Sequence, residues 1–472
     1  WCRLLASYLS RRNLSVEIID AVADDLTYTD IAVRVAAEKP GLIIIVVHSH
    51  QPSASTQTMP FAIATCRAIK ELSSRPILVV GGHPAALPSR TLIETGADFV
   101  CTGEGPVTSY LLAQVVVNNL DWRSADKSKV LGVAYYDERV LCKTSSAPNV
   151  DDLDNEMPGG MWDKLPMAKY RAHNFQCLDG SPRTPYASVQ SSLNCSYQCS
   201  YCMISTVFRE GDLLKSGGKP VNFYRMWSSD TIAAEIKTLV ETYGVTTIRF
   251  DDEMFCLNPM HVRDVCEKII ALGYGDMLNL FAYTRIDTCR PQYLEPMRKA
   301  GFKWISPGIE AASTYVRGAV DKSQFSYDDI MRTCELIKSQ DINIIANVMV
   351  GLPNDTIESM EETVKMALEI NAEWLNIYGT MIYPGSPLWD GLPEEKRNYR
   401  WETYSHHGYE CEPAGNETLS PAEVLRFRDA AFVRYYSSDM YQAMVERKFG
   451  KQVRAHIQEM LGHKLSRKMW GY

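Results

Sequence analysis

Three cysteines lie close together in the segment NCSYQCSYCM, residues 194–203, at Cys195, Cys199 and Cys202. Clustered thiolates bind metals, and zinc and iron–sulfur clusters are the usual choices. A structural zinc site takes four ligands, and the next cysteine along this chain is Cys256. Three thiolates on a [4Fe-4S] cluster leave one iron open to another ligand. The spacing favours an iron–sulfur cluster, with zinc and unrelated thiols as the alternatives.

The composition sets wider bounds on function. The chain has 472 residues, a net charge of -8, 46% hydrophobic and 22% charged residues, which is typical of a globular protein of two or three domains. An acidic balance gives no reason to expect nucleic acid or an anionic membrane as partner. Thirteen cysteines, an odd number spread along a chain without an export signal, do not indicate a disulfide scaffold. No apolar run reaches the ~20 residues of a membrane helix.

The elements that position the cysteines form a repeating pattern between residues 181 and 395. Buried strands alternate with helices such as 229–244 and 327–341, so we expect six β/α units. Six units predict a partial TIM-type barrel, whose active face lies at the carboxyl ends of its strands. The cysteines directly follow the first strand. The predicted strands are 186–193, 246–255, 279–286, 304–311, 342–351 and 374–384.

A second α/β region precedes the barrel. Continuous Val/Ile strands separated by helices in residues 1–120 predict a parallel sheet with a Rossmann-like fold. Ligands of such sheets bind beyond the carboxyl ends of the strands, which here carry glycines that either admit a ligand or only make tight turns. The predicted strands are 14–21, 41–49, 75–82 and 97–105.

The remaining residues connect and follow these two regions. We expect residues 121–180 to be a linker that contains a small hairpin at 130–144. Residues 396–472 are predicted to be mainly helical, with Ser420 as an N-cap and Pro421 at the first helical position. The C-terminal helical segment, together with residues 401–411 before it, is predicted to cap the barrel opening and to shape substrate access. The expected fold is therefore α/β, in regions 1–120, 121–180, 181–395 and 396–472.

The cysteine loop resembles that of a known family. C-x3-C-x-aromatic-C after the first strand of a partial barrel, with Tyr201 as the aromatic residue, is similar to the signature of the radical S-adenosylmethionine (SAM) enzymes. The resemblance implies that SAM chelates the fourth iron. It also implies that reductive cleavage of SAM releases a 5′-deoxyadenosyl radical, which abstracts hydrogen from the substrate.

The same resemblance implies contacts with SAM at later strand ends. Carboxylates after the second strand would accept the methionine ammonium group, or else they only provide solubility. Arg285 would pair with the methionine carboxylate and Glu310 with the ribose, or else these two side chains pair with each other. Backbone around Gly351 would contact the adenine. The residues implied for SAM binding are Tyr201, Asp251, Asp252, Glu253, Arg285, Glu310 and Gly351.

The order of the regions is also similar to that of the cobalamin-binding radical SAM enzymes, because GGHPAALP and GEGP precede the cysteine loop. The D-x-H-x-x-G motif of proteins that replace the lower cobalt ligand is not found. We expect the first strand of the sheet to lie before Trp1, which would leave the sheet one strand short. The residues implied for cobalamin binding are Ser53, Thr56, Gly81, Gly82, His83, Gly103 and Glu104.

The resemblance implies an enzyme like the class B methyltransferases. It would methylate an unactivated carbon, or phosphorus, of a small-molecule or natural-product substrate through methylcobalamin and a 5′-deoxyadenosyl radical. One alternative is a rearrangement or oxidative cyclisation without methyl transfer, and another is a corrinoid or Fe-S sensor. An electron donor such as flavodoxin or ferredoxin is expected as partner. The oxygen-sensitive cluster and the lack of an export signal favour the cytoplasm.

Overall fold

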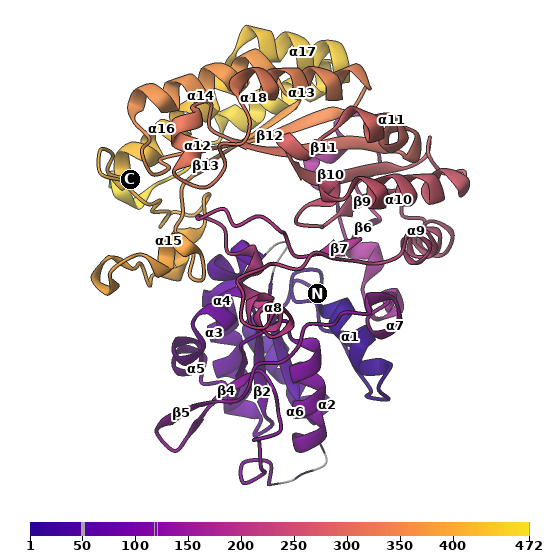
Figure 1. The fold of residues 1–472 in the computed structure, drawn as a ribbon, viewed down its shortest axis with the longest axis vertical. Helices are drawn as coiled ribbons and strands as arrows, with labels where there is room; N and C mark the ends of the chain where they lie inside the picture. Colours follow the sequence, from indigo (N-terminus) through magenta and orange to yellow (C-terminus); the bar gives the residue numbers. More distant parts are fainter. Residues whose placement is uncertain (49–51, 118, 120, 472) are drawn as a thin grey trace.

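The computed structural model describes residues 1–48, 52–117, 119 and 121–471. Figure 1 shows two lobes, one with the N-terminal sheet and its helices and the other with a larger sheet and the C-terminal helices. Three parallel strands and an antiparallel hairpin form the N-terminal sheet. Its strands are, in order, β1 (Ile43–Val47), β2 (Ile77–Gly81), β3 (Phe99–Cys101), β4 (Val133–Asp137) and β5 (Val140–Lys143).

Helices cover both faces of this N-terminal sheet, as the continuous apolar strands require. The helix α2 begins at a capping box in which Thr27 and Asp30 bond each other's backbone N–H groups. The predicted hairpin forms and extends the sheet beyond β3. The helices of this lobe are α2 (Tyr28–Glu38), α3 (Ser55–Leu72), α4 (Gly82–Ala86), α5 (Pro88–Thr95) and α6 (Pro106–Val116).

The strand predicted for residues 14–21 is wrong, because residues 14–20 have no regular secondary structure and a turn begins at Ala21. A strand needs a hydrogen-bonding neighbour. In the described sheet β1 pairs with β2 and forms the edge, so this segment lies outside the ladder. Its alternating residues Leu14 and Val16 are half-buried and pack against the core instead.

The second lobe contains the six predicted barrel strands. All five neighbouring pairs are parallel and follow chain order, which confirms the partial barrel. Runs such as FAYTR and IIANVMV are buried because helices cover the outer face. The strands are β6 (Tyr186–Val189), β9 (Thr247–Phe250), β10 (Asn279–Arg285), β11 (Phe302–Glu310), β12 (Asn343–Val350) and β13 (Trp374–Gly379).

The barrel helices begin at the caps that the sequence provides. Ser420 accepts a hydrogen bond from the backbone N–H of Glu423, and Pro421 occupies the first helical position, as predicted. Ser228 and Ser326 cap two earlier helices in the same way. The outer helices are α9 (Ser229–Tyr243), α10 (Pro259–Ala271), α11 (Pro291–Ala300), α13 (Tyr327–Ser339), α14 (Ile357–Ile370) and α16 (Pro421–Ser437).

The first helix, α1 (Cys2–Ser10), packs with the barrel core. Leu4, Leu5 and Leu9 belong to the same buried cluster as the barrel strands. Arg3 anchors the helix through a 2.5 Å ion pair with Glu235 of α9, and both side chains are buried. Figure 1 shows this helix at the side of the N-terminal lobe, below the barrel lobe.

The C-terminal region is helical, as predicted, and is fastened to the last barrel strand. In α16 and α17 (Asp439–Phe449), the hydroxyls of Tyr435, Tyr436 and Tyr441 donate to backbone carbonyls of residues 372, 375 and 373. The helix α18 (Lys451–Gly462) follows. None of the helices in the described part of the chain has the length and apolar character needed to cross a bilayer.

Residues 401–411, part of the predicted cap of the barrel opening, also pack against the N-terminal lobe. Trp401 and Tyr404 lie in a core cluster with Met59 and Leu92 of the N-terminal lobe. Large aromatic rings gain most by full burial, and α3 and α5 supply the apolar surface for it. Tyr404 and His406 also have ring contacts with the barrel region, at 5.5 Å from Tyr383 and 5.2 Å from Tyr378. This segment therefore connects the two lobes, and its role as a cap of the barrel opening stays a prediction.

Candidate active site

The cysteine loop begins after β7 (Ser192–Leu193), which pairs with β8 (Arg225–Met226). Asn194 adopts a left-handed conformation, φ 73°, and its side-chain oxygen accepts hydrogen bonds from the backbone N–H of Cys195 at 2.8 Å and from Ser205. Asn222 donates to the carbonyls of Cys195 and Tyr197 at 3.0 and 3.1 Å. Two asparagines thus fix the conformation of the loop.

The three thiols suit a cluster better than a single ion. Burial raises the pKa of Cys195 to about 12 and also raises the pKa values of Cys199 and Cys202, so a bound cation is needed to make them thiolates. Among the described residues no three His, Cys, Asp or Glu side chains converge to hold one metal ion. In a [4Fe-4S] cluster each thiolate binds a separate iron, and this donor set fits that arrangement with one iron left open.

The acidic residues after β9 lie together, but they have different partners. Asp251 forms an ion pair with Arg249, with Nε and Oδ1 3.0 Å apart. Asp252 accepts hydrogen bonds from the backbone N–H of Ser191 and from the hydroxyls of Ser191 and Ser192. Glu253 is different, because its Oε2 is buried and has no hydrogen-bond partner among the described residues. It is the carboxylate best placed to receive a ligand.

Burial dominates the electrostatics of this acidic group. It raises the pKa of Asp252 to about 6, although the serine hydrogen bonds oppose the shift. It raises the pKa of Glu253 to about 8, and the neighbouring Asp252 and Asp251 contribute to the increase. A carboxylate held in this way is strongly stabilised by an added cation. The methionine ammonium group of SAM therefore fits Glu253.

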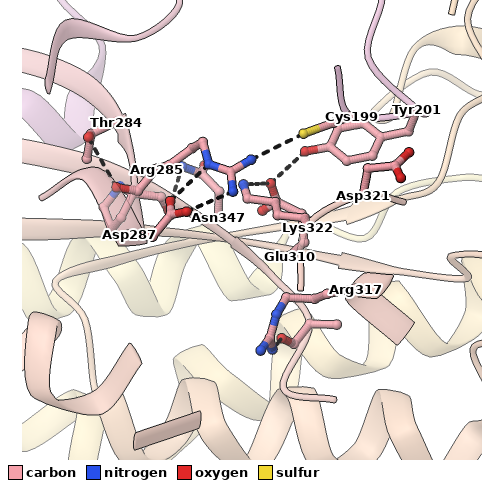
Figure 2. Close-up of polar contacts among 12 residues, drawn as sticks. Cys199, Tyr201, Thr284, Arg285, Asp287, Glu310, Arg317, Asp321, Lys322 and Asn347 are labelled. Carbon is pink, nitrogen blue, oxygen red and sulfur yellow. Dashed lines mark hydrogen bonds and ion pairs between the residues drawn. The ribbon is translucent and has the colours of Figure 1, made fainter. Parts of the chain in front are cut away.

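Tyr201 and Glu310 are in contact, as Figure 2 shows. The tyrosine hydroxyl donates to Glu310 Oε1 at 2.6 Å. The same carboxylate forms an ion pair with Lys322, and both side chains are buried. Glu310 ends β11 with φ 66°, a strained value for a side chain other than glycine. Lys322 is a site residue that the sequence analysis missed, since nothing in its loop distinguishes it from a surface lysine.

Arg285 lies at the end of β10, as predicted, but its guanidinium already has partners. It forms a two-pronged ion pair with Asp287, at 2.9 Å for each hydrogen bond, and donates to Gln324 at 3.1 Å. It also donates to Cys199 Sγ at 3.3 Å (Figure 2). The alternative in which Arg285 pairs with Glu310 is wrong. Asp287, two residues along the chain, is the partner that spacing could have indicated.

Gly351 follows β12 at the carboxyl edge of the barrel sheet. Its backbone N–H donates to Asp355 at 2.9 Å. Its φ is 77°, and an added Cβ would lie 2.7 Å from the methyl groups of Val424 in α16. A glycine is thus needed here for both conformation and close packing of a helix. The structure places it at the predicted edge, with its N–H already bonded.

The predicted cobalamin residues after β2 form a compact turn. Gly81 has φ 153°, and an added Cβ would lie 2.0 Å from the carbonyl of Val47. The next residue is Gly82, and His83 then bonds Ser55 through its N–H at 2.9 Å, with its Nδ1 3.4 Å from the hydroxyl of Thr56. His83 Nε2 is buried without a hydrogen-bond partner in the described structure. An unpaired buried nitrogen beside two glycines suits a polar cofactor group.

The other residues predicted to bind cobalamin have different surroundings from one another. Ser53 lies half-buried in the 3-10 turn Pro52–Ala54, while the preceding residues 49–51 are outside the described part. Gly103 faces the carbonyl of Val207. The Glu104 carboxylate is 2.9 Å from Arg225 and accepts from the N–H of Val150 at 2.7 Å. Its side chain therefore joins the lobes. A small cavity beside it is lined by Trp1, Leu5, Val46, His48, Val80, Gly81, Glu104 and Val207.

Comparison with known proteins agrees with this geometry. The sequence model of the Radical SAM superfamily matches residues 189–367, and that of the B12 binding domain matches residues 1–113. The chain is 26% identical over 385 residues to the uncharacterized methyltransferase PH0819 of Pyrococcus horikoshii, covering 80% of this chain and 75% of the relative. It is 24% identical to the anaerobic magnesium-protoporphyrin IX monomethyl ester cyclase of Cereibacter sphaeroides, covering 86% of this chain and 62% of the relative.

Solved structures share the fold. TsrM of Kitasatospora setae, a radical S-adenosylmethionine methyltransferase solved with cobalamin and a [4Fe-4S] cluster, superimposes with a TM-score of 0.66 at 15% identity, covering 90% of this chain and 81% of TsrM. The cobalamin-dependent radical enzyme OxsB, solved with aqua-cobalamin and SAM, gives 0.57 at 16% identity, covering 84% and 52%. This chain therefore contains a radical SAM domain and an N-terminal B12-binding domain, and it is an enzyme whose cofactors are a [4Fe-4S] cluster, SAM and cobalamin.

Proposed function

We propose that this enzyme methylates an unactivated carbon, or phosphorus, of a small-molecule substrate. One observation carries the proposal: the loop that follows β3 is joined to the hairpin that holds the cysteine loop. Glu104 and Arg225 form this connection at 2.9 Å, and both side chains are buried. The carboxyl edges of both sheets, where each fold binds its ligand, therefore meet at one place.

The cofactors supply the difficult chemistry, since cobalamin transfers a methyl group and the cluster with SAM provides the radical that abstracts hydrogen. The chain's own residues hold and orient these groups. Cys195, Cys199 and Cys202 hold the cluster. Glu253 accepts hydrogen bonds from the ammonium group of SAM, and Glu310 accepts from its ribose hydroxyls. Gly81, Gly82 and His83 are proposed to contact cobalamin.

The proposed substrate chamber is the barrel interior, which is lined by fixed polar groups. Asn376 donates to Asn347 at 3.0 Å, and Asn347 donates to the hydroxyl of Ser306 at 2.7 Å. Arg249 lies 5.4 Å from the centre of the Tyr283 ring. Such a surface offers hydrogen bonds and ring faces to a small polar or aromatic molecule. An electron donor such as flavodoxin or ferredoxin and a cytoplasmic location are part of the same proposal.

Cyclisation or rearrangement without methyl transfer is the second candidate. It is favoured by the similarity to two anaerobic magnesium-protoporphyrin IX monomethyl ester cyclases, at 24% and 26% identity. The same cofactors serve both kinds of reaction, so the residues described above do not separate them. The products do, because methyl transfer also yields S-adenosylhomocysteine.

The test uses protein reconstituted anaerobically with iron, sulfide and cobalamin, then reduced and given SAM with a deuterated methyl group. Mass spectrometry of the released corrinoid and of the nucleoside products is the measurement. Label on the corrinoid together with S-adenosylhomocysteine supports methyl transfer. Release of 5′-deoxyadenosine with no label on the corrinoid supports the second candidate. Glu253→Gln should lose SAM cleavage, whereas Glu241→Gln, an exposed change on α9, should retain it.

A further inference from the structure

A guanidinium group lies against one of the three cysteines. Arg285 Nη1 is 3.3 Å from Cys199 Sγ, within hydrogen-bonding range for sulfur. The arginine side chain is only 4% exposed, so water does not compete strongly for this donor. A charge-assisted hydrogen bond in a buried place is stronger than one between neutral groups.

Other contacts fix the orientation of that donor. Asp287 binds Nε and Nη2, and Gln324 accepts a second bond from Nη2. The guanidinium lies over the ring of Tyr197 at 3.8 Å, inside the cysteine loop itself. Asp287, Gln324 and Tyr197 thus hold the rest of the guanidinium group, and its Nη1 atom is directed at the sulfur of Cys199 (Figure 2). Buried Lys322 adds a further positive charge near Cys199.

We propose that Arg285 sets the reduction potential of the cluster by donating a hydrogen bond to Cys199. The inference rests on the proposed role of Cys199 as a cluster ligand. Reduction adds an electron to a cluster whose charge is partly carried by the cysteine sulfurs, so a donor at the sulfur binds the reduced form more strongly. Hydrogen bonds and nearby charge are the known means by which proteins adjust such potentials. Arg285 therefore raises the potential and makes the cluster easier to reduce.

This role differs from recognition of the SAM carboxylate. To bind a carboxylate with its two-pronged edge, Arg285 would have to release Asp287, which already occupies that edge at two hydrogen bonds of 2.9 Å. Arg285 can donate a hydrogen bond from Nη1 to the sulfur of Cys199 while it keeps both hydrogen bonds to Asp287. The two roles therefore predict different measurements for the same substitution.

The experiment is a redox titration of the reconstituted protein, followed by electron paramagnetic resonance of the reduced cluster, with SAM affinity measured separately by equilibrium dialysis. In Arg285→Gln the equilibrium constant for one-electron reduction should fall about tenfold, which moves the midpoint about 59 mV more negative. SAM affinity should change less than about threefold. Arg285→Lys, which keeps the charge but loses the planar fork, should give a smaller negative shift.

Asp287→Asn is the matched control, since it keeps the Arg285 guanidinium and leaves an amide oxygen that can accept one of its two hydrogen bonds. Removing a negative charge near the cluster should leave the potential unchanged or raise it. A negative shift as large as that of Arg285→Gln would mean general loosening of the site and would overturn the assignment. So would an unchanged potential in Arg285→Gln with SAM affinity reduced tenfold or more. Failure of the wild-type protein to assemble any cluster would instead contradict the proposed role of the cysteines.

Discussion

The indole ring of Trp401 packs edge-on against the imidazole ring of His83, with ring centroids 4.3 Å apart. The two residues come from the first and the last quarter of the chain. Trp401 also donates a hydrogen bond from Nε1 to Glu94 at 2.7 Å. The segment after the barrel is thereby held against the B12-binding domain, beside a histidine that we propose contacts cobalamin.

Removing this aromatic contact should destabilise the protein. Trp401→Ala deletes a buried ring and should lower the free energy of unfolding by about 3–5 kcal/mol. Trp401→Phe keeps most of the ring and loses the bond to Glu94, so it should cost about 1–3 kcal/mol. Urea denaturation followed by circular dichroism measures both. A cost below about 1 kcal/mol for the alanine variant would show that the contact contributes little.

Acid should destabilise the fold through His83. Burial, aided by the Arg90 guanidinium, lowers the pKa of His83 from 6.5 to about 3. Between these pH values the unfolded chain binds a proton that the folded protein does not, so the free energy of unfolding falls as the pH is lowered. Near pH 5 this one group contributes about 1.4 kcal/mol per pH unit. His83→Gln should make the stability curve shallower by that amount between pH 6 and 4, and an identical slope in the variant would contradict the burial argument.

The buried pair of Lys322 and Glu310 should tolerate loss of both charges better than loss of one. Lys322→Met leaves the Glu310 carboxylate buried with Tyr201 as its remaining hydrogen-bond donor, and such unmatched charge costs about 3–5 kcal/mol. Adding Glu310→Gln should recover most of that loss. The double-mutant cycle in urea is the measurement. Additive losses in the double variant would show that the two side chains are not coupled.

Cluster assembly should depend on three of the thirteen cysteines. Cys195→Ser, Cys199→Ser and Cys202→Ser should each lose most iron and sulfide after anaerobic reconstitution, because oxygen is a poor substitute for a thiolate ligand. Cys256→Ser is the control, as Cys256 is a buried core residue and should retain the cluster. Equal iron in Cys199→Ser and Cys256→Ser would exclude Cys199 as a ligand.

The parts of the fold that sequence predicted are those with local causes. Each barrel strand is a short apolar run bounded by turn residues. The Ser420 cap can be recognised from residues 420–423 alone. The order of the six strands also follows, since right-handed β/α units place successive parallel strands side by side. The segment 14–21 has the right residues for a strand, but strand formation needs a neighbour, and that depends on the rest of the sheet.

Long-range partners could not be predicted in this way. Lys322 reaches Glu310 across a loop, and Arg225 reaches Glu104 from the other lobe. Neither pair has a spacing along the chain that sets it apart. The acidic triplet was predicted as a group, but only the folded structure shows that serines bond one member and an arginine another. Glu253 is then the member of the triplet with an oxygen that has no hydrogen-bond partner in the described part of the chain.

The ion pair between Glu104 and Arg225 has a consequence for protein engineering. Both side chains are at most 5% exposed. Replacing one of them by a neutral residue would leave the other charge buried without its partner and should strongly lower the free energy of unfolding. A chimaera that takes its B12-binding domain from a related protein would place a foreign residue opposite Arg225. Such a graft should succeed only when the donor domain carries an acid at the position of Glu104, or when both positions are exchanged together.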